Sequence, residues 1–484
     1  MNQSPSDVTD NGPRTTREDT IAAIATPPGR GGIGVVRLSG DGAISIACGL
    51  IHLPTLSPET QHATVGEFRE PNSDRILDKV VVTIFRAPHS YTGEDIAEIS
   101  CHGAPVILGY LVECCLNRGA RPAEAGEFTL RAFLNGRIDL TQAEAVRDLI
   151  ESRTLYQAQT AAQQMEGAVS ARIKPHKKAL VDLIARLEAG IDFAEDDVPV
   201  SGWQEIEQSL SAISRDLEHL ASGYEYGRVV REGLSLAIVG RPNVGKSSLF
   251  NRLLNEERAI VTPTPGTTRD LVAESAAIGG IPLRLVDTAG LRETADEAER
   301  IGVRKTKEVI AASDLRLLVL DVSQDWTAED CTLLDRLRPL GGLLVVFNKT
   351  DLPPRLREAD LASASNPEGG LATSEAGRSL NVVRTSALTG EGIPELKSKL
   401  LDVAAPARDV NPDGALITNL RHQQLIRKSL DALTHAREAA REHVHHEMLL
   451  LDLYDALHAL DTITGATTVE DVLGVIFSSF CVGK

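Results

Sequence analysis

The stretch that decides the fold is Gly240-Arg241-Pro242-Asn243-Val244-Gly245-Lys246-Ser247-Ser248. It follows the apolar run 234–239, which predicts a buried strand, and precedes residues 249–254, whose apolar positions have helical spacing. A glycine-rich loop that ends in Lys-Ser between a strand and a helix is the phosphate-binding loop in its structural context. Backbone N–H groups can surround a phosphate, Lys246 can reach the terminal phosphates, and the Ser247 hydroxyl can hold Mg²⁺. The sequence therefore predicts a nucleoside triphosphate site.

Two later segments fit the γ-phosphate and the metal. The apolar run 283–286 leads into Asp287-Thr288-Ala289-Gly290, where a carboxylate can support Mg²⁺ and a glycine N–H can sense the γ-phosphate. Between the phosphate loop and Asp287 lies Val261-Thr262-Pro263-Thr264-Pro265-Gly266-Thr267-Thr268-Arg269-Asp270, which favours a switch loop with Thr268 as the second Mg²⁺ ligand. Leu291 follows the glycine, so the glutamine that orients water in many GTPases is absent. Another group must therefore position the water.

The base is selected by residues at the ends of two further predicted strands. The apolar run 343–347 ends in Asn348-Lys349-Thr350-Asp351, and Ser386-Ala387 follows the run 382–385. The Asp351 carboxylate can accept from both the ring N–H and the exocyclic amine of guanine, whereas adenine would leave groups unpaired there. The backbone near Ala387 suits donation to the guanine oxygen. These motifs, in this order, predict GTP as the nucleotide.

Together the motifs resemble the potassium-activated GTPases of the Era, Der and MnmE group. The resemblance rests on G-R-P-N-V-G-K-S-S, T-P-G-T-T-R-D, D-T-A-G-L-R-E-T and N-K-T-D. It implies that Asn243 helps to hold K⁺, with further oxygens from Thr262, Thr264 and Thr267, and that the cation does the electrostatic work of an arginine finger. It also implies that Glu299 orients the attacking water, although the sequence alone favours a solvated helix residue there.

The same resemblance implies which residues surround the nucleotide. They come from the phosphate loop, the switch loop and the later motifs, and they are Asn243, Val244, Gly245, Lys246, Ser247, Ser248, Thr262, Pro263, Thr264, Pro265, Gly266, Thr267, Thr268, Asp287, Thr288, Ala289, Gly290, Asn348, Lys349, Asp351, Ser386, Ala387 and Leu388. Within this set, Ser247 and Thr268 are the expected Mg²⁺ ligands. The expected cofactors of this part are GTP, Mg²⁺ and K⁺.

The segment before residue 138 resembles the N-terminal domain of the MnmE (TrmE) family. The matching stretches are A-T-P-P-G-R-G-G-I-G-V-V-R-L-S-G, S-Y-T-G-E-D, C-H-G-A-P-V, G-E-F-T-L-R-A-F-L-N-G-R-I-D-L and Q-A-E-A-V. The resemblance implies a fold similar to folate-binding domains, holding 5-formyl- or 5,10-methylene-tetrahydrofolate. The folate contacts would be Arg37, Glu98 and Arg137, with Lys484 from the C-terminus. A carboxylate such as Glu98 can accept two hydrogen bonds from the aminopyrimidine edge of a pterin, and arginine suits carboxylates.

The pattern along the chain predicts a combined α/β and all-α protein. A mixed α/β, folate-binding-like N-terminal domain would precede a helical domain that is split by an inserted P-loop GTPase domain. In the first domain the pattern predicts strands at 20–25, 34–38, 79–85 and 96–100 and a helix at 105–116, and after the GTPase domain it predicts that helices resume at 416–460. The expected boundaries are a disordered tail at 1–18, the folate-binding and dimerisation domain at 19–137, helical parts at 138–232 and 404–484, and the G domain at 233–403. Most of the Pro/Ser/Gly-rich insert 353–380 is expected to be a surface loop without a catalytic role.

Composition limits the class of protein. The 484-residue chain carries a net charge of −18, which argues against sequence-independent binding along a nucleic-acid backbone, although local basic patches stay possible. Its six cysteines show no C-x-x-C pairing, which is typical of reduced thiols. No apolar run has the length of a membrane span, and the first twenty residues are polar. We expect a cytoplasmic protein without a membrane segment.

The chain ends in Cys481-Val482-Gly483-Lys484, which resembles the closing motif of the MnmE family. In that family the cysteine lies near the folate site and is implicated in the modification chemistry, so Cys481 is the second candidate catalytic residue beside Glu299. The resemblance implies a homodimer that acts on tRNA with the flavoprotein MnmG (GidA). The two proteins would add an aminomethyl or carboxymethylaminomethyl group to carbon five of the wobble uridine, using a tetrahydrofolate one-carbon unit.

Two other functions remain open at this point. A regulatory switch in ribosome assembly, of the Era or Der kind, would carry the same G motifs but would need neither residues 19–137 nor the cysteine terminus. A signalling GTPase that depends on an external activator would hydrolyse GTP slowly in K⁺ and Na⁺ alike.

Overall fold

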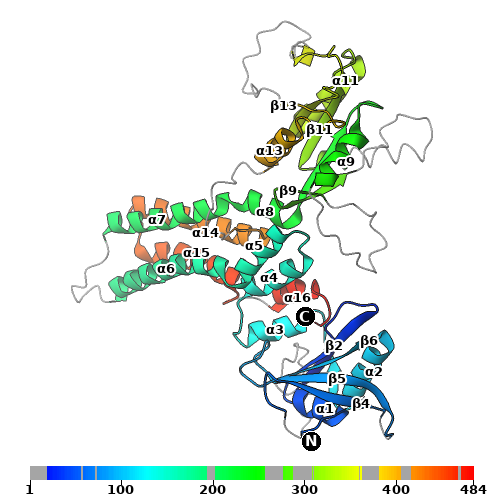
Figure 1. Ribbon diagram of the computed structural model, residues 1–484. Coiled ribbons are helices and arrows are strands. Elements are labelled where there is room, and N and C mark those ends of the chain that lie inside the picture. Colours follow the sequence, from blue (N-terminus) through cyan, green and yellow to red (C-terminus); the bar gives the residue numbers. More distant parts are fainter. Residues whose placement is uncertain are drawn as a thin grey trace, which may run out of the picture. The chain divides into compact units, whose positions relative to one another are not determined.

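The computed structural model (Figure 1) describes residues 19–55, 58–70, 73–192, 202–256, 276–286, 308, 310–358, 360–361, 381–404, 416–466 and 470–483. By their contacts, residues Met1–Glu144 and Thr468–Lys484 form one compact unit (unit 1), and residues Ala145–Thr467 form the other (unit 2). The C-terminal helix therefore packs with the N-terminal unit. The predicted boundary at 404 groups this helix with the helical domain instead, so the domain boundaries stay a prediction. Among the described residues, no helix combines the length and apolar character needed to cross a bilayer.

Unit 1 is built on a seven-stranded sheet in the order β3-β4-β5-β6-β2-β1-β7. Its pairs are antiparallel except β1 with β7. Alternate residues of β5 are buried, as expected of a strand with one face on the core. The strands are β1 (Thr20–Ile24), β2 (Gly31–Ser39), β3 (Ile51–His52), β4 (Ala63–Arg69), β5 (Ile76–Phe85), β6 (Ile96–Gly103) and β7 (Ala120–Pro122). The predicted strands near residues 20, 34, 79 and 96 are thus confirmed.

The helices of unit 1 lie between these strands in the sequence or come after them. They are α1 (Ala43–Leu50), α2 (Pro105–Leu116), α3 (Glu127–Leu134), α4 (Leu140–Glu151), which crosses the division between the units, and α16 (Glu470–Ser478). The helix predicted at 105–116 is confirmed, with Pro105 at its first turn, where no backbone donor is needed. The core packs α1 and α2 on β2, β5 and β6, with Leu38, Ile99 and Leu111 fully buried.

The helical part of unit 2 is a bundle made by two separated stretches of chain. Its helices are α5 (Leu155–Met165), α6 (Ala168–Asp192), α7 (Trp203–Ser222), α8 (Tyr224–Glu232), α14 (Leu420–Arg441) and α15 (His446–Thr464). One core joins α6, α7, α14 and α15. The prediction of a helix from Leu416 is wrong for the first residues, because the Asn419 side chain caps α14 by accepting from the Arg421 N–H. Residues 442–445 also separate α14 from α15.

Between these stretches lies a six-stranded sheet in the order β13-β12-β11-β8-β10-β9. All its pairs are parallel except β9 with β10. The strands are β8 (Leu234–Val239), β9 (Ala276–Ile278), β10 (Ile281–Val286), β11 (Leu315–Asp321), β12 (Leu343–Asn348) and β13 (Asn381–Arg384). The helices with it are α9 (Lys246–Glu256), α11 (Ala328–Leu337), the 3₁₀ turn η1 (Arg338–Leu340) and α13 (Ile393–Ala404). A parallel sheet with one core cluster on each face places the ends of β8 and β12 at the same edge.

The first part of the insert 353–380 is an exception to the surface loop expected for most of it. Leu356 and Leu361 are 4% and 3% exposed and belong to the core cluster that contains Phe347 and Leu334. These two leucines cover one face of the sheet, so the first residues of the insert help to build the G-domain core. Residues 362–380 lie outside the described residues.

Candidate functional site

The predicted phosphate loop follows β8 and enters α9, as its sequence context requires. Two of its glycines have backbone angles or neighbours that exclude a side chain. Gly240 has a φ of +155° and a Cβ there would lie 2.4 Å from the Val319 carbonyl oxygen. Gly245 has a φ of +97° and a Cβ would lie 2.3 Å from the Asn348 Nδ2. The loop can therefore approach the neighbouring strands closely because neither position carries a side chain.

The Lys246 side chain folds back onto its own loop. Its Nζ donates to the carbonyl oxygens of Gly240 and Arg241, at 2.7 Å each. Burial lowers the pKa of Lys246, and the nearby Glu329 opposes that shift. An ammonium that donates to carbonyl oxygens can exchange them for phosphate oxygens, which are stronger acceptors.

Asn348 and Lys349 brace the phosphate loop from the end of β12. The Asn348 side chain is almost completely buried and donates through Nδ2 to the Val244 carbonyl oxygen at 2.9 Å. The Lys349 Nζ donates to the Asn243 carbonyl oxygen at 2.8 Å and to the Asp321 Oδ2 at 2.7 Å. The structure thus brings the predicted base-recognition motif into direct contact with the predicted phosphate loop.

The other base-recognition residues lie beside Asn348. Ser386 is fully buried, and its Oγ donates to the Asp351 Oδ1 at 2.5 Å, which orients the carboxylate expected to read guanine. The Ala387 N–H donates to the Asn348 Oδ1 at 3.1 Å. This N–H, expected to face the guanine oxygen, is thus already paired within the protein. Leu388 is 80% exposed.

Part of the predicted site lies outside the described residues. This part comprises the switch loop, the γ-phosphate motif, the water-orienting candidate and the terminal lysine, which are Thr262, Pro263, Thr264, Pro265, Gly266, Thr267, Thr268, Asp287, Thr288, Ala289, Gly290, Glu299 and Lys484. Among the residues that are described, no group of three or more His, Cys, Asp and Glu side chains could hold a metal ion. The Mg²⁺ candidate Ser247 is exposed in the first turn of α9.

Two acidic residues that support the loop were missed by the sequence analysis. Asp321 ends β11 and pairs with Lys349, and hydrogen bonds from Lys349 and Ser323 hold its pKa below the ordinary value although burial opposes this. Asp330 accepts from the Arg241 Nε at 2.8 Å and also forms a capping box with Thr327 at the start of α11. An acidic residue directly after an apolar strand was a usable signal for Asp321. Nothing in the sequence pattern connects Asp330 with Arg241.

In unit 1, the structure pairs two of the three folate candidates that it describes. The Arg37 Nε and Nη2 lie 2.9 and 2.8 Å from the Glu98 Oε1, and the two residues are cross-strand neighbours on β2 and β6. The guanidinium also lies 5.6 Å from the ring centre of Phe128 and 5.9 Å from that of Tyr91. Arg137 is exposed, and its Cγ lies 3.3 Å from the Cβ position of Gly93. A pterin that binds Glu98 would share this carboxylate with Arg37.

The C-terminal tail is attached to unit 1 by backbone contacts. Val482 forms an antiparallel bridge with Ala125, and the Gly126 N–H donates to the Cys481 carbonyl oxygen at 3.4 Å. Gly483 lies so close to β1 that a Cβ would be 2.4 Å from the Ile24 carbonyl oxygen. Cys481 itself is exposed and is a free cysteine. The tail is therefore fixed while its thiol side chain stays accessible.

Comparisons with known proteins identify the family of this chain. The family model described as "GTP-binding protein TrmE N-terminus" matches residues 20–137, and the "MnmE helical domain" model matches residues 140–481. A tRNA modification GTPase MnmE of Koribacter versatilis (strain Ellin345) is 53% identical over 96% of this chain and 99% of its own length. The chain belongs to the MnmE family of tRNA modification GTPases.

Other members of the MnmE family are similar over the same length. The MnmE protein of Syntrophus aciditrophicus (strain SB) is 43% identical, with 96% of this chain and 100% of that protein covered. The solved structure of Aquifex aeolicus Era with GDP and AlF₄⁻ matches at 29% identity over 41% of this chain and 66% of that chain, with a TM-score of 0.28. The expected MnmE family and GTP hydrolase activity are confirmed. A ribosome-assembly switch is not favoured.

Proposed function

We propose that the chain is a K⁺-activated GTPase that modifies the wobble uridine of tRNAs together with MnmG. The observation that carries the GTPase part is the position of Asn243 in the phosphate loop. Its φ is +62°, a conformation that asparagine tolerates better than most residues, and Lys349 holds its carbonyl group. The Asn243 side chain is exposed, where an amide oxygen can serve a cation beside the phosphates.

The donor set fits the two ions. Amide, hydroxyl and backbone oxygens are the ligands that hard cations prefer. In this proposal Ser247 and Thr268 hold Mg²⁺, whereas Asn243, Thr262, Thr264 and Thr267 hold K⁺, which supplies positive charge where negative charge develops in the transition state. Glu299 orients the attacking water. Asp351 selects guanine, and the buried Ser386 hydroxyl keeps its carboxylate oriented.

The potassium assignment is tested by measuring GTP turnover in K⁺ and in Na⁺ at equal ionic strength. We expect turnover to be at least about 10-fold faster in K⁺, since a well-placed charge at the transition state contributes several kcal/mol. Asn243→Ala should lose this preference, whereas Asn251→Ala, an exposed position on α9, should keep it. Equal rates in both salts for the native protein would remove the potassium assignment and favour a GTPase that needs an external activator.

The folate part of the proposal places 5-formyl- or 5,10-methylene-tetrahydrofolate at Arg37, Glu98, Arg137 and Lys484. Its support is the Arg37–Glu98 pair, whose side chains are 20% and 27% exposed, beside the rings of Tyr91 and Phe128. A charged pair next to aromatic rings can take a flat, polar heterocycle by stacking and hydrogen bonding. Calorimetric titration with 5-formyltetrahydrofolate should show binding that Glu98→Gln weakens at least about 10-fold, because a charged acceptor is lost. Unchanged affinity would exclude Glu98.

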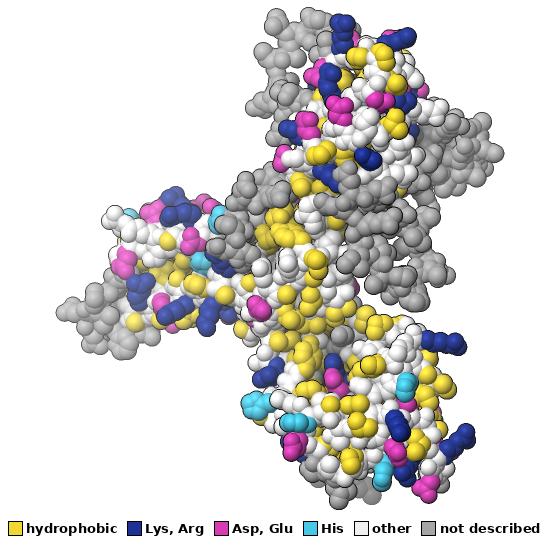
Figure 2. Space-filling model, viewed as in Figure 1, with side chains coloured by type: hydrophobic (Ala, Val, Ile, Leu, Met, Phe, Trp, Pro, Cys, Tyr) yellow, Lys and Arg dark blue, Asp and Glu magenta, His cyan; other side chains and the backbone are white. Residues whose placement is uncertain are grey.

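The remaining parts of the proposal are a cytoplasmic homodimer and cooperation with MnmG on tRNA. Figure 2 shows hydrophobic side chains gathered on the visible face of unit 1. Ile33, Val65 and Val106 of this unit are 70%, 65% and 76% exposed, which supports dimerisation through it. In this reaction Cys481 would act beside the folate.

Nucleoside analysis tests the modification itself. In tRNA from a strain that lacks this protein, the wobble uridines should lose the aminomethyl or carboxymethylaminomethyl group at carbon five. Expression of the native protein should restore it, and a Cys481→Ser variant should not if the thiol takes part. Unchanged wobble uridines in the deletion strain would reject the modification and leave only the GTPase activity.

A further inference from the structure

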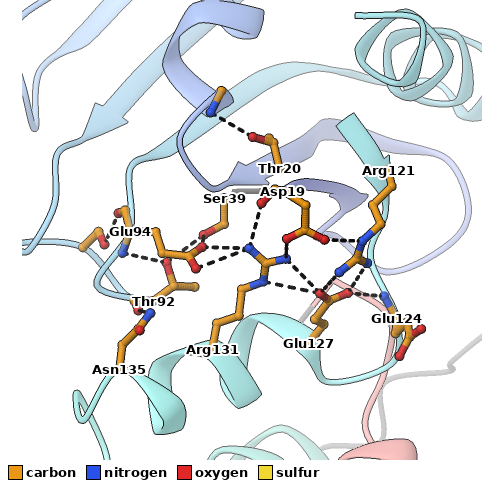
Figure 3. Close-up of polar contacts among 12 residues, drawn as sticks. Asp19, Thr20, Ser39, Thr92, Glu94, Arg121, Glu124, Glu127, Arg131 and Asn135 are labelled. Atoms are coloured by element: carbon orange, nitrogen blue, oxygen red, sulfur yellow. Dashed lines mark hydrogen bonds and ion pairs between the residues drawn. The ribbon is translucent and has the colours of Figure 1, made fainter. Parts of the chain in front are cut away.

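A network of charged side chains surrounds α3 in unit 1 (Figure 3). At its centre Arg131 is 7% exposed, and its guanidinium contacts three carboxylates, those of Asp19 at 2.7 Å, Glu127 at 3.0 Å and Glu94 at 3.1 Å. Glu127, also 7% exposed, accepts from both terminal nitrogens of Arg121. No residue proposed for GTP or folate belongs to this network. Removing charges from water costs free energy, so a buried network with this many ion pairs suggests a role in the protein.

One side of the network holds the loop that receives the C-terminal tail. The Glu127 Oε2 accepts from the Glu124 N–H at 2.8 Å, which closes the turn before α3. Within this turn Ala125 bridges to Val482, and Gly126 donates to Cys481. Gly126 has a φ of +67°, and a Cβ there would lie 2.8 Å from the Phe477 carbonyl oxygen, so α16 also packs closely against it. The position of the Cys481 backbone therefore depends on the start of α3.

The other side of the network holds the loop 90–95 between β5 and β6. Arg131 contacts the Glu94 carboxylate, and the Asn135 Nδ2 donates to the Thr92 carbonyl oxygen at 2.8 Å. The Tyr91 hydroxyl lies 3.0 Å from the Thr129 Oγ1. Residues along α3 thus support this loop at three points.

The loop 90–95 in turn touches two folate candidates. The Tyr91 ring lies under the Arg37 guanidinium, and Gly93 packs against the Arg137 side chain. One helix, α3, therefore contacts both the loop beside the folate candidates and the turn that receives Cys481. A second connection between these two places runs through β1, which Gly483 approaches at Ile24 and which pairs Ala23 with Arg37.

We propose that Arg131 and Glu127 are positioning residues that set the Cys481 tail relative to the folate-binding residues. This inference rests on the proposed folate function. Arg131 is suited to the task because its planar fork reaches several carboxylates in fixed directions, which a single ammonium cannot do. Neither side chain is among the residues proposed to contact folate. They act through α3, the turn 124–126 and the loop 90–95.

The test measures the alkylation rate of Cys481 by iodoacetamide, with and without saturating 5-formyltetrahydrofolate, by mass spectrometry of the C-terminal peptide. That peptide separates Cys481 from the other free cysteines. In the native protein, bound folate should slow the alkylation at least about 5-fold, as occupation of a neighbouring site shields a thiol. Arg131→Lys, which keeps the charge, should lose most of this protection even when folate is saturating. The control Arg75→Lys, an exposed arginine of the same unit, should retain it.

Hydrogen exchange in the same samples separates positioning from general unfolding. In Arg131→Lys, exchange should accelerate in the peptides that contain residues 90–95 and 477–483, whereas α2 in the core of unit 1 should keep its protection. If exchange in α2 also accelerates, Glu127→Gln serves as the milder variant, and it should lose the folate protection with α2 intact.

The outcomes distinguish the two proposals. Native protein without folate protection of Cys481 would reject the folate site beside the tail, and this inference with it. Protection in the native protein that persists undiminished in both variants would overturn the positioning role alone and leave the folate site in place. Basal GTP hydrolysis should be unchanged in both variants, since the nucleotide site lies in unit 2.

Discussion

The phosphate loop of unit 2 and the tail-holding region of unit 1 keep their shapes in different ways. Residues 240–246 are held mainly by backbone groups, with Val244 and Asn243 accepting from Asn348 and Lys349. The region around α3 is held by carboxylates and guanidinium groups of Asp19, Glu94, Glu127, Arg121 and Arg131. A backbone-built site is sensitive to added side chains, whereas a charge-built site is sensitive to the loss of single charges.

The largest effect is expected from Glu127→Ala. It removes one of the two carboxylates that Arg121 and Arg131 share, the other being Asp19. Removal of one partner from a buried ion pair such as Arg131–Glu127 costs about 3–5 kcal/mol. Urea denaturation that is monitored by hydrogen exchange of unit 1 peptides should show this loss in the free energy of unfolding of unit 1. Glu113→Ala, an exposed position on α2, is the control. If GTP affinity falls in parallel, the two sites are not held independently and the comparison fails.

A smaller effect is expected from Gly245→Ala in the phosphate loop. The new methyl group would lie 2.3 Å from the Asn348 Nδ2 at a φ of +97°. Backbone strain of this kind costs about 1–3 kcal/mol, so affinity for a fluorescent GTP analogue should fall about 10- to 100-fold. Gly109→Ala, where a Cβ would meet nothing within 4 Å, should bind normally. Unchanged affinity in Gly245→Ala would mean that the loop is not held by close backbone approach.

A carboxylate beside the loop, that of Asp321, sharpens the comparison. Burial raises the pKa of Asp321, but hydrogen bonds from Lys349 and Ser323 outweigh it, so the folded pKa lies below the ordinary value of 3.8. A lowered pKa means that the stabilisation is fully present above the unfolded pKa and is lost as pH falls through the folded pKa. Asp321→Asn should therefore cost about 1–3 kcal/mol at neutral pH.

Urea titrations at several pH values measure this effect. The difference between native protein and Asp321→Asn should be constant above about pH 5 and should shrink below about pH 4. A difference that instead grows toward acid pH would contradict the ion pair with Lys349. Ser323→Ala, which removes one neutral donor to the same carboxylate, should reproduce the trend with a smaller amplitude.

The smallest effect is expected from Arg384→Gln. Arg384 and Glu358 form an ion pair at 3.2 Å, but their side chains are 57% and 56% exposed. Exposed pairs contribute about 0–1 kcal/mol, so the melting temperature should change little at any salt concentration. The same type of contact is thus weak at the surface and strong around Arg131. A large destabilisation by Arg384→Gln would show that burial is not what separates the two cases.

The sequence was most informative where function depends on consecutive residues. The strand before Gly240, the helix after Lys246 and the strands that end at Asp287 and Asn348 were predicted from apolar runs, and the described parts agree. The base-recognition motif was also predicted, because each of its residues follows a strand end. Sequence analysis could not find the Arg241–Asp330 contact, which joins residues 89 positions apart.

The N-terminal site, in contrast, is not encoded in consecutive residues. Arg37, Glu98 and Arg137 were named only through a family resemblance, since the two arginines look like ordinary surface charges in the sequence. Sheet pairing of β2 with β6 brings Arg37 and Glu98 together across 61 positions. Leu356 and Leu361 lie in an insert that was mostly assigned to a surface loop because it is rich in turn residues, yet both are in the core.

By itself, the sequence determined the nucleotide loop, the order of strands and helices around it, and the family. These features depend on local backbone geometry and on the periodicity of apolar residues, which are written in neighbouring positions. Only the tertiary structure decided that Arg131 joins Asp19, Glu94 and Glu127, and that the last residues pack beside Gly126. The physical reason is that burial and the pairing of charges depend on which distant segments meet, and no local pattern records that choice.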